Sequence, residues 1–322
     1  MEAYNIIRRL ERHRKIAYIL TRFILIGILA AFVAMPIMLG VVAPAQESVA
    51  EGRGDTIKWV CCGLFFLFLI VSPFAASINN KALERLNKEY KELVLSKIMP
   101  VLPEGITYDP EGGFTLEEFI DTHVAVLPMR EGYTYTCESE DSLAGSYNGK
   151  QFKQSDIKVT RIVKRQGQSP EKAIIIDGVL TCFEYKTTMK QNVSIMSHMP
   201  LNVIAPDFHN LAHVHMEDLE FNEMFDIFAS DAHYAYYILT PHFMEHLKEL
   251  YGKTNGRLYL RFDGDHLYMV RDVSGGIFSP PPLSEKITMQ EVIRRSKDDI
   301  KYIFKTIDIL QMGEEGNTMQ IQ

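Results

Sequence analysis

Two uninterrupted apolar runs dominate the first eighty residues of the chain. The first extends from Phe23 to Ala45 and the second from Trp59 to Ile78, and neither contains a charged side chain. An α-helix needs roughly 20 apolar residues to cross the hydrocarbon core of a bilayer, and both runs are of that length. The pattern predicts two transmembrane helices within residues 23–78, with the lipid bilayer as the first expected partner.

Cationic side chains flank the outer ends of these two runs. Residues 1–22 carry six Lys or Arg and residues 79–99 carry five, whereas the intervening loop 46–58 carries only Arg53 and Lys58. Because Lys and Arg are retained on the cytoplasmic side, we expect both termini and the main domain in the cytoplasm and the loop outside. A cleaved signal peptide ending near Ala45 is the alternative, although the first run is longer than a typical signal-peptide core.

A polar helix with one apolar stripe is expected to continue the second span over residues 79–100. Leu83, Leu86, Tyr90 and Leu93 recur at three- and four-residue steps, and Pro100 ends the pattern. The stripe could pack on its own domain or pair with a second copy of the chain. Self-association could also use the small residues of the first span, which are Gly27, Ala30, Ala31 and Ala34.

Alternating and β-branched segments indicate strands over much of residues 101–311. The pattern predicts a hairpin turn at Asp177-Gly178, a further strand over 221–230 and a second hairpin turn over 263–265. Helices are expected after an N-cap at Ser230, from Thr240 to Gly252, and over residues 288–310, followed by a loose tail at 312–322. Strands joined by hairpins, with helices grouped later, predict an α+β domain with a mainly antiparallel sheet and C-terminal helices.

The composition of this domain excludes several functional classes. From residue 100 onward the chain has 21 basic and 33 acidic side chains, and such an acidic domain disfavours binding to nucleic acid. No GxGxxG or GxSxG motif occurs, and Gly145 to Lys150 lacks the spacing and the hydroxyl of a phosphate-binding loop. We therefore expect no cofactor. The four cysteines form no CxxC pair, which fits a reducing compartment.

His242, Glu245 and His246 fit the HxxEH pattern, in which two imidazoles one helical turn apart bind Zn²⁺ and the carboxylate activates water. The same spacing also describes an ordinary solvated helix face, because Phe243, Leu247 and Leu250 define the opposite, apolar face. The solvated face is the simpler interpretation.

A second group of potential ligands is formed by His209, His213 and His215 with the nearby carboxylates Asp207, Glu217 and Asp218. Two histidines separated by one residue on a strand point to the same face, where they could hold a metal together with a carboxylate. Histidine-rich loops are also common without a metal. Neither group is taken as a metal site, and no catalytic residue is assigned.

The segment Glu217 to Leu250, EDLEFNEMFDIFASDAHYAYYILTPHFMEHLKEL, resembles a bacterial membrane family known as domain of unknown function 3137. The segment around Asp177-Gly178-Val179 and Phe183 is similar to another core segment of that family. The resemblance covers roughly Leu83 to Leu310. It implies a bacterial inner-membrane protein and implies no reaction, cofactor or catalytic residue.

Three hypotheses follow from the sequence. The leading one is a membrane-anchored protein whose cytosolic domain binds a protein partner or small ligand without catalysis. The second is a metal-dependent enzyme that uses one of the two histidine groups. The third is a structural subunit of an inner-membrane complex.

Overall fold

The computed structural model describes residues 2–38, 51–98, 100, 102–125, 127–128, 130–165, 167, 169–184, 191–198, 211–273 and 276–318. The chain divides into two compact units. The first comprises Met1–Val94 with Ser279–Val292, and the second comprises Leu95–Phe278 with Ile293–Gln322. We call them the helical unit and the sheet unit.

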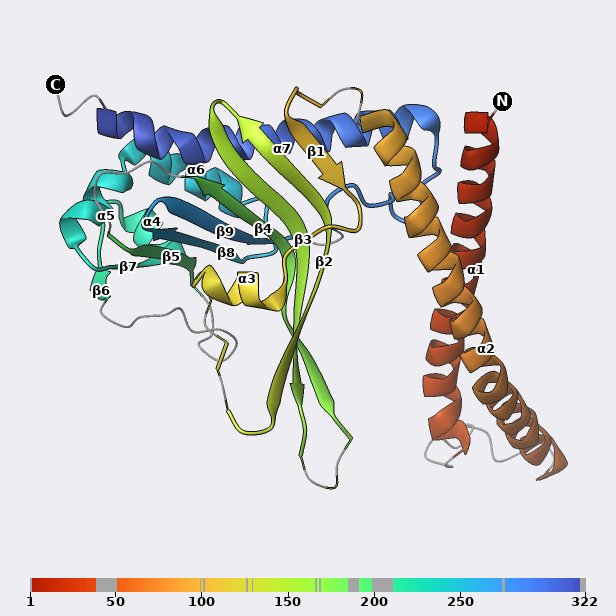
Figure 1. The fold of residues 1–322 in the computed structure, drawn as a ribbon. Helices are drawn as coiled ribbons and strands as arrows, with labels where there is room; N and C mark the ends of the chain where they lie inside the picture. The colour runs from red at the N-terminus through yellow and green to blue at the C-terminus, as the bar shows by residue number, and fades with distance from the viewer. Residues whose placement is uncertain are drawn as a thin grey trace. The chain divides into compact units, whose positions relative to one another are not determined.

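Two long helices, α1 (Glu2–Met38) and α2 (Glu51–Ile98), form an antiparallel pair in the helical unit (Figure 1). Asn79 Nδ2 donates to Thr21 Oγ1 over 3.3 Å. Farther along, a Cβ on Gly27 would lie 2.0 Å from the ring of Phe68, so this glycine admits the aromatic ring of the neighbouring helix. Gly27 is one of the four small residues that the sequence suggested for self-association. In the structure it contacts the other helix of the same chain.

The helix α2 confirms that the apolar run and the following polar segment form one continuous helix, which ends before Pro100. It also begins at Glu51, eight residues before the apolar run, so residues 51–58 are helical. Within the predicted stripe, Leu86, Tyr90 and Leu93 are each no more than 2% exposed. These side chains are covered within the chain.

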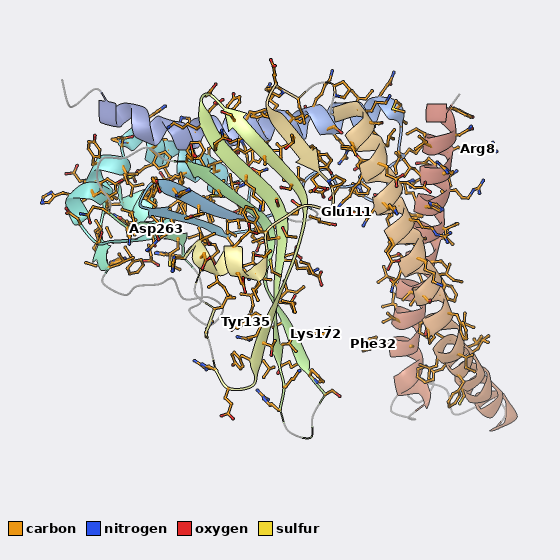
Figure 2. All side chains as sticks on the ribbon, in the orientation of Figure 1. Arg8, Phe32, Glu111, Tyr135, Lys172 and Asp263 are labelled. Atoms are coloured by element: carbon orange, nitrogen blue, oxygen red, sulfur yellow. The ribbon has the colours of Figure 1, made fainter. Side chains whose placement is uncertain are left out.

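Apolar side chains are exposed along most of both helices. Of the twenty large apolar residues that are exposed in the described structure, seventeen lie on α1 and α2. Phe32, for example, is 72% exposed and projects freely from α1 (Figure 2). Both helices are long and apolar enough to cross a membrane. Such a surface is unusual for a protein surrounded by water, because exposed apolar patches on soluble proteins are small.

The connector 279–288 is tied to α1 inside the helical unit. Glu11 accepts a hydrogen bond of 2.6 Å from the backbone N–H of Ile287 and pairs with Arg14 through both carboxylate oxygens. Arg14 in turn donates to the carbonyl of Leu283. These bonds satisfy a guanidinium that is only 7% exposed.

The sheet unit is built on a nine-stranded sheet of antiparallel pairs, in the order β1-β2-β3-β4-β9-β8-β5-β7-β6 (Figure 1). Its strands are β1 (Ile106–Asp109), β2 (Tyr133–Tyr147), β3 (Lys150–Val163), β4 (Glu171–Glu184), β5 (Val193–Ser197), β6 (Ala212–Val214), β7 (Phe225–Ala229), β8 (Leu258–Asp263) and β9 (His266–Asp272). The helices are α3 (Leu116–Asp121), α4 (Leu219–Met224), α5 (Ala232–Ile238), α6 (Pro241–Tyr251) and, from Ile293 onward, α7 (Met289–Thr318). The predicted α+β class with an antiparallel sheet is confirmed.

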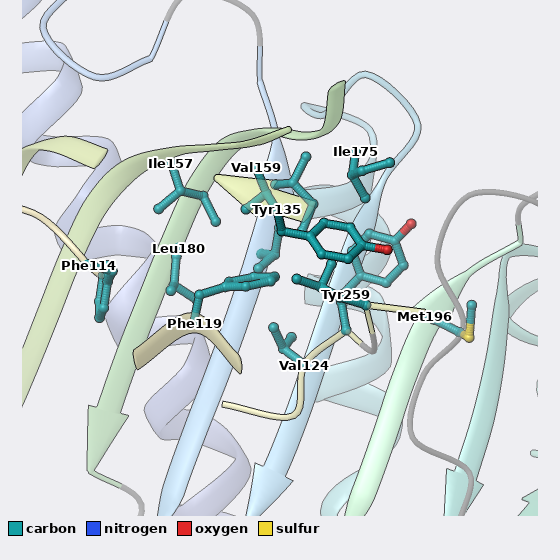
Figure 3. Packing of buried hydrophobic residues seen from close by; sticks show 14 residues of the cluster. Phe114, Phe119, Val124, Tyr135, Ile157, Val159, Ile175, Leu180, Met196 and Tyr259 are labelled. Carbon is teal, nitrogen blue, oxygen red and sulfur yellow. The ribbon is translucent and has the colours of Figure 1, made fainter. Parts of the chain in front are cut away.

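The sheet carries apolar side chains on both faces. On one face, Phe119 of α3 lies among Val159, Leu180 and Tyr259 in the main core cluster (Figure 3). On the other face, Phe304 of α7 packs edge-on against Phe152 of β3. This two-sided burial explains why several strands read as nearly continuous apolar runs rather than as alternating ones.

The predicted hairpin at Asp177-Gly178 is wrong. Both residues lie in the middle of β4, where Gly178 is opposite Ile157 of β3 and Asp272 of β9. A Cβ on Gly178 would lie 1.9 Å from the carbonyl oxygen of Arg271, so glycine is needed for close approach of a neighbouring strand. Asp-Gly has the same sequence signature in a turn and in a crowded strand, and only the strand pairing distinguishes them.

Other local predictions have mixed outcomes. The strand predicted over 221–230 is helical to Met224 and becomes β7 only at Phe225, and the N-cap of α5 is Asp231 rather than Ser230. The hairpin turn between β8 and β9 is confirmed, with Gly264 at φ +60°. The helix α7 continues to Thr318, beyond the end that the periodicity predicted.

Candidate functional site

The described members of the two histidine groups lie in the sheet unit, and Asp207 and His209 are outside the described residues. His213 is on the edge strand β6 and His215 follows it, with their rings 4.4 Å apart between centroids. The Nε2 atom of His213 lies 3.3 Å from Asp226 Oδ1. His198, at the end of β5, places its own Nε2 atom 3.1 Å from the same oxygen.

Sequence reasoning missed His198 and Asp226 as partners of His213. They meet because β5 and β6 pair with opposite edges of β7, which is not visible in local patterns. All three side chains are between a third and a half exposed. Among the residues that the structure describes, no group of three His, Cys, Asp or Glu side chains is arranged to hold a metal ion.

The HxxEH residues lie on α6, whose ends are well defined locally. Thr240 accepts a hydrogen bond from the backbone N–H of Phe243, Pro241 occupies the first turn, and Gly252 ends the helix. Phe243 and Leu247 are buried, so His242 and Glu245 lie on the exposed side, as the solvated-face interpretation expects. The ring nitrogens of His242 and His246 are 3.1 Å apart.

The carboxylate that would activate water in a protease has another partner here. Glu245 Oε1 lies 2.6 Å from Lys248 Nζ, which also contacts Asp218 Oδ2 at 3.2 Å and Glu220 Oε2 at 2.9 Å. The hydrogen bonds that Lys248 donates to Glu245, Glu220 and Asp218 raise the pKa of Lys248 above its usual range. The lysine therefore stays charged and links the N-terminus of α4 to α6.

Members of both histidine groups come together at one cleft of about 810 Å³. Its two walls are the segment 215–218 and the region from α5 into the first turns of α6. Met216, Leu239 and Met244 are buried residues of its lining, whereas the exposed rim includes polar and charged side chains. The full lining consists of His215, Met216, Glu217, Asp218, Tyr236, Leu239, Pro241, His242, Met244 and Glu245.

Hydrogen bonds fix the wall formed by residues 215–218. Asn222 accepts from the backbone N–H of Met216 at 2.9 Å and donates to its carbonyl at 2.7 Å. The hydroxyl of Tyr236 donates to the carbonyl of His215 at 3.2 Å. Asp218 caps α4 by accepting from the N–H of Phe221, and this bond, together with Lys248, lowers the pKa of Asp218. These bonds fix the position of residues 215–218.

Charge and exposed apolar surface coincide at this cleft. The rim and the adjoining turn of α4 contain four carboxylates, namely Glu217, Asp218, Glu220 and Glu245, and Lys248 contacts the last three. Leu219, next to the cleft, is 77% exposed and Tyr236 is 50% exposed. In the described part of the sheet unit, only Ile174 is a comparably exposed large apolar side chain.

The two thiols of the sheet unit have unreactive environments. Burial is the main reason that the pKa values of Cys137 and Cys182 are raised to about 11. Both thiols are therefore protonated near neutral pH, and since the thiolate is the nucleophile, neither resembles an activated cysteine.

Comparison with known proteins supports the resemblance stated from the sequence. The family described as "Protein of unknown function (DUF3137)" matches residues 174–312, a segment that includes every residue of the cleft. The match covers a little under half of the chain. A search of curated proteins found no significant match.

Among solved structures, the chain is similar to the mycobacterial trehalose monomycolate transport factor A, TtfA. The sequence identity is 6%, the TM-score is 0.30, and the match covers 69% of this chain and 92% of that chain. A TM-score of this size carries no argument about fold or function.

Proposed function

We propose that this protein is a membrane-anchored binding module of the bacterial inner membrane, with its sheet unit in the cytoplasm and without a catalytic role. The anchor is the pair α1 and α2. Its support is the exposed apolar surface of these helices, together with the cationic residues at their outer ends.

The cleft at residues 215–218 and α6 is the proposed binding site. The observation that carries this proposal is the position of Leu219 and Tyr236, two exposed apolar side chains beside a cleft rimmed by carboxylates. An apolar cleft with an acidic rim complements a partner segment in which an apolar anchor is flanked by Lys or Arg. The proposed partner is therefore a protein that presents such a segment, and the acidic sheet unit disfavours nucleic acid.

The test measures peptide binding to the full chain in lipid nanodiscs. The probe is a fluorescein-labelled peptide with a Leu-Phe pair flanked by Lys and Arg, and nanodiscs without protein give the background. We expect saturable binding that Leu219→Ser weakens by about tenfold, the effect of losing one apolar anchor. Glu217→Gln should weaken it less and should reduce its dependence on salt.

Matched controls lie elsewhere on the sheet unit. Ile174→Ser removes an exposed apolar side chain from β4, and Glu171→Gln removes an exposed carboxylate from the same strand. Both should leave peptide affinity unchanged. Equal losses in control and cleft variants, or binding that does not depend on Leu219, would contradict the assignment of this cleft.

A further inference from the structure

A second cavity, of about 400 Å³, lies between α1 and α2 in the helical unit. Its lining contains two arginines from α1 and a lysine and an arginine from α2, with two carboxylates and one histidine. The lining residues are Arg9, Arg12, His13, Arg85, Lys88, Glu89 and Glu92. Four cations against two carboxylates leave the cavity positively charged. We call it the basic groove.

The four cations of the basic groove differ from Arg14 and Arg22 in having no internal partner. Arg14 binds Glu11 and the carbonyl of Leu283, and Arg22 lies over the ring of Tyr18 at 5.3 Å. Within the ranges that the structure describes, the four cations of the groove have no ion-pair or hydrogen-bond partner, and all four are exposed. Unpaired cations that converge from two helices are a site for an anion.

One buried nitrogen of the groove, His13 Nδ1, points to the same conclusion. His13 Nδ1 and Glu89 Oε2 lie 3.7 Å apart, with side chains only 16% and 22% exposed. Neither atom makes a hydrogen bond in the described structure, although both are shielded from solvent. A buried polar atom without a partner is costly, so an anion that accepts a hydrogen bond from His13 Nδ1–H would be favourable, whereas the Glu89 carboxylate is itself an acceptor and gives no support for an anion.

The positive-inside rule explains why these cations are present but not why they converge. Retention of Lys and Arg near a span requires only their number close to the membrane. Here residues about 75 positions apart in the sequence line one cavity, and guanidinium groups at its edge offer the paired donors that suit phosphate oxygens. We propose that the basic groove binds a phosphate-bearing anion.

The distance of the basic groove from the hydrocarbon core indicates whether a soluble molecule or a lipid headgroup is expected to supply the phosphate. Thr21 and Asn79 pair where both helices change from polar to apolar, so this pair marks the boundary of the hydrocarbon core if α1 and α2 span the membrane as proposed above. At 1.5 Å per residue, the cations lie about 10–20 Å beyond that boundary along the helices. Lipid headgroups occupy only about 5–8 Å on each side of the core. The groove therefore favours a water-soluble phosphate, such as a pyrophosphate or nucleotide group, over a lipid phosphate.

The experiment uses the full chain in detergent, titrated with inorganic pyrophosphate at physiological salt by calorimetry. We expect saturable binding that the double variant Arg12→Gln/Arg85→Gln weakens at least about tenfold, because two of the four cations are removed. The matched control is Arg8→Gln/Lys15→Gln, which removes the same charge from exposed residues of α1 outside the groove lining, and it should weaken binding less than about twofold. Arg8 projects from α1 in Figure 2.

Two further measurements distinguish a soluble phosphate from the phosphate of a lipid headgroup. In nanodiscs, a pyrophosphate affinity that is equal in neutral and phosphatidylglycerol-containing bilayers supports a soluble ligand. An affinity that falls with phosphatidylglycerol in the parent and in the control supports the same phosphate site with a lipid headgroup as its occupant.

Absence of saturable pyrophosphate binding in detergent, or equal losses in the two double variants, would overturn the proposal. These results do not depend on peptide binding at the cleft, so the two proposals fail separately.

Discussion

At the scale of single residues, the turn at residues 276–278 combines an unusual backbone conformation with buried side chains. Phe278 has φ +56° although it is not glycine, and its buried ring packs edge-on against Tyr108 with centroids 5.1 Å apart. Asp156 accepts a hydrogen bond from the backbone N–H of Ile277. Asp299 of α7 accepts one from the N–H of Phe278. Two carboxylates thus hold a turn that is strained by its conformation.

Asp299→Asn should remove a pH-dependent cost to stability. Burial is the main cause that raises the pKa of Asp299 to about 6. The folded chain therefore holds this proton more tightly than the unfolded chain, and the contribution of Asp299 to stability is lost as pH rises from about 4 to 6. An amide keeps an acceptor for Phe278 without a buried charge. Relative to the parent, the variant should gain about 2 kcal/mol between about pH 4 and pH 7.

Thermal unfolding of the full chain in detergent, followed by circular dichroism across this pH range, measures the difference. Asp298→Asn is the control for loss of a carboxylate, because Asp298 is exposed and pairs with Arg294 on the same helix. Parallel curves for the parent and Asp299→Asn would show that the carboxyl is not the source of the pH dependence.

At the scale of elements, the structure depends on close pairing between strands that are distant in sequence. β4 lies between β3 and β9, and Gly178 sits where the backbone of β9 approaches most closely. The limits of the helix α6, by contrast, depend on residues that are close in sequence. Thr240 and Gly252 delimit α6 through local caps, so its limits could be predicted from the sequence alone.

Gly178→Ala should destabilise the sheet unit by about 1–3 kcal/mol, because the added methyl would overlap the carbonyl of Arg271 and the strands must separate to admit it. Gly252→Ala is the matched control, since its Cβ would meet its nearest neighbour at an ordinary 3.6 Å. Both variants are compared with the parent by thermal unfolding. A Gly178→Ala variant as stable as Gly252→Ala would mean that β9 can move away without cost.

For the whole molecule, the proposed topology makes a prediction that is independent of any ligand. The residues between the two helices should be outside the cytoplasmic membrane and the sheet unit inside. In a cysteine-free variant, Ser48→Cys should react with an impermeant maleimide added to intact cells, whereas Glu171→Cys, an exposed position of β4, should react only after lysis. Labelling of Glu171→Cys in intact cells would contradict a cytoplasmic sheet unit.

The sequence determined the features that depend on neighbouring residues. Local composition and backbone preference account for the two apolar runs, the continuity of the helix α2, the limits of α6 and the tight turn at Gly264. Tertiary structure decided what depends on strand register and on contact between distant segments. It placed Gly178 inside a strand, brought His215 and His242 to one cleft, and gathered cations of α1 and α2 around one cavity. Such meetings arise from packing across many residues, and a local pattern contains no information about which partner a side chain will meet.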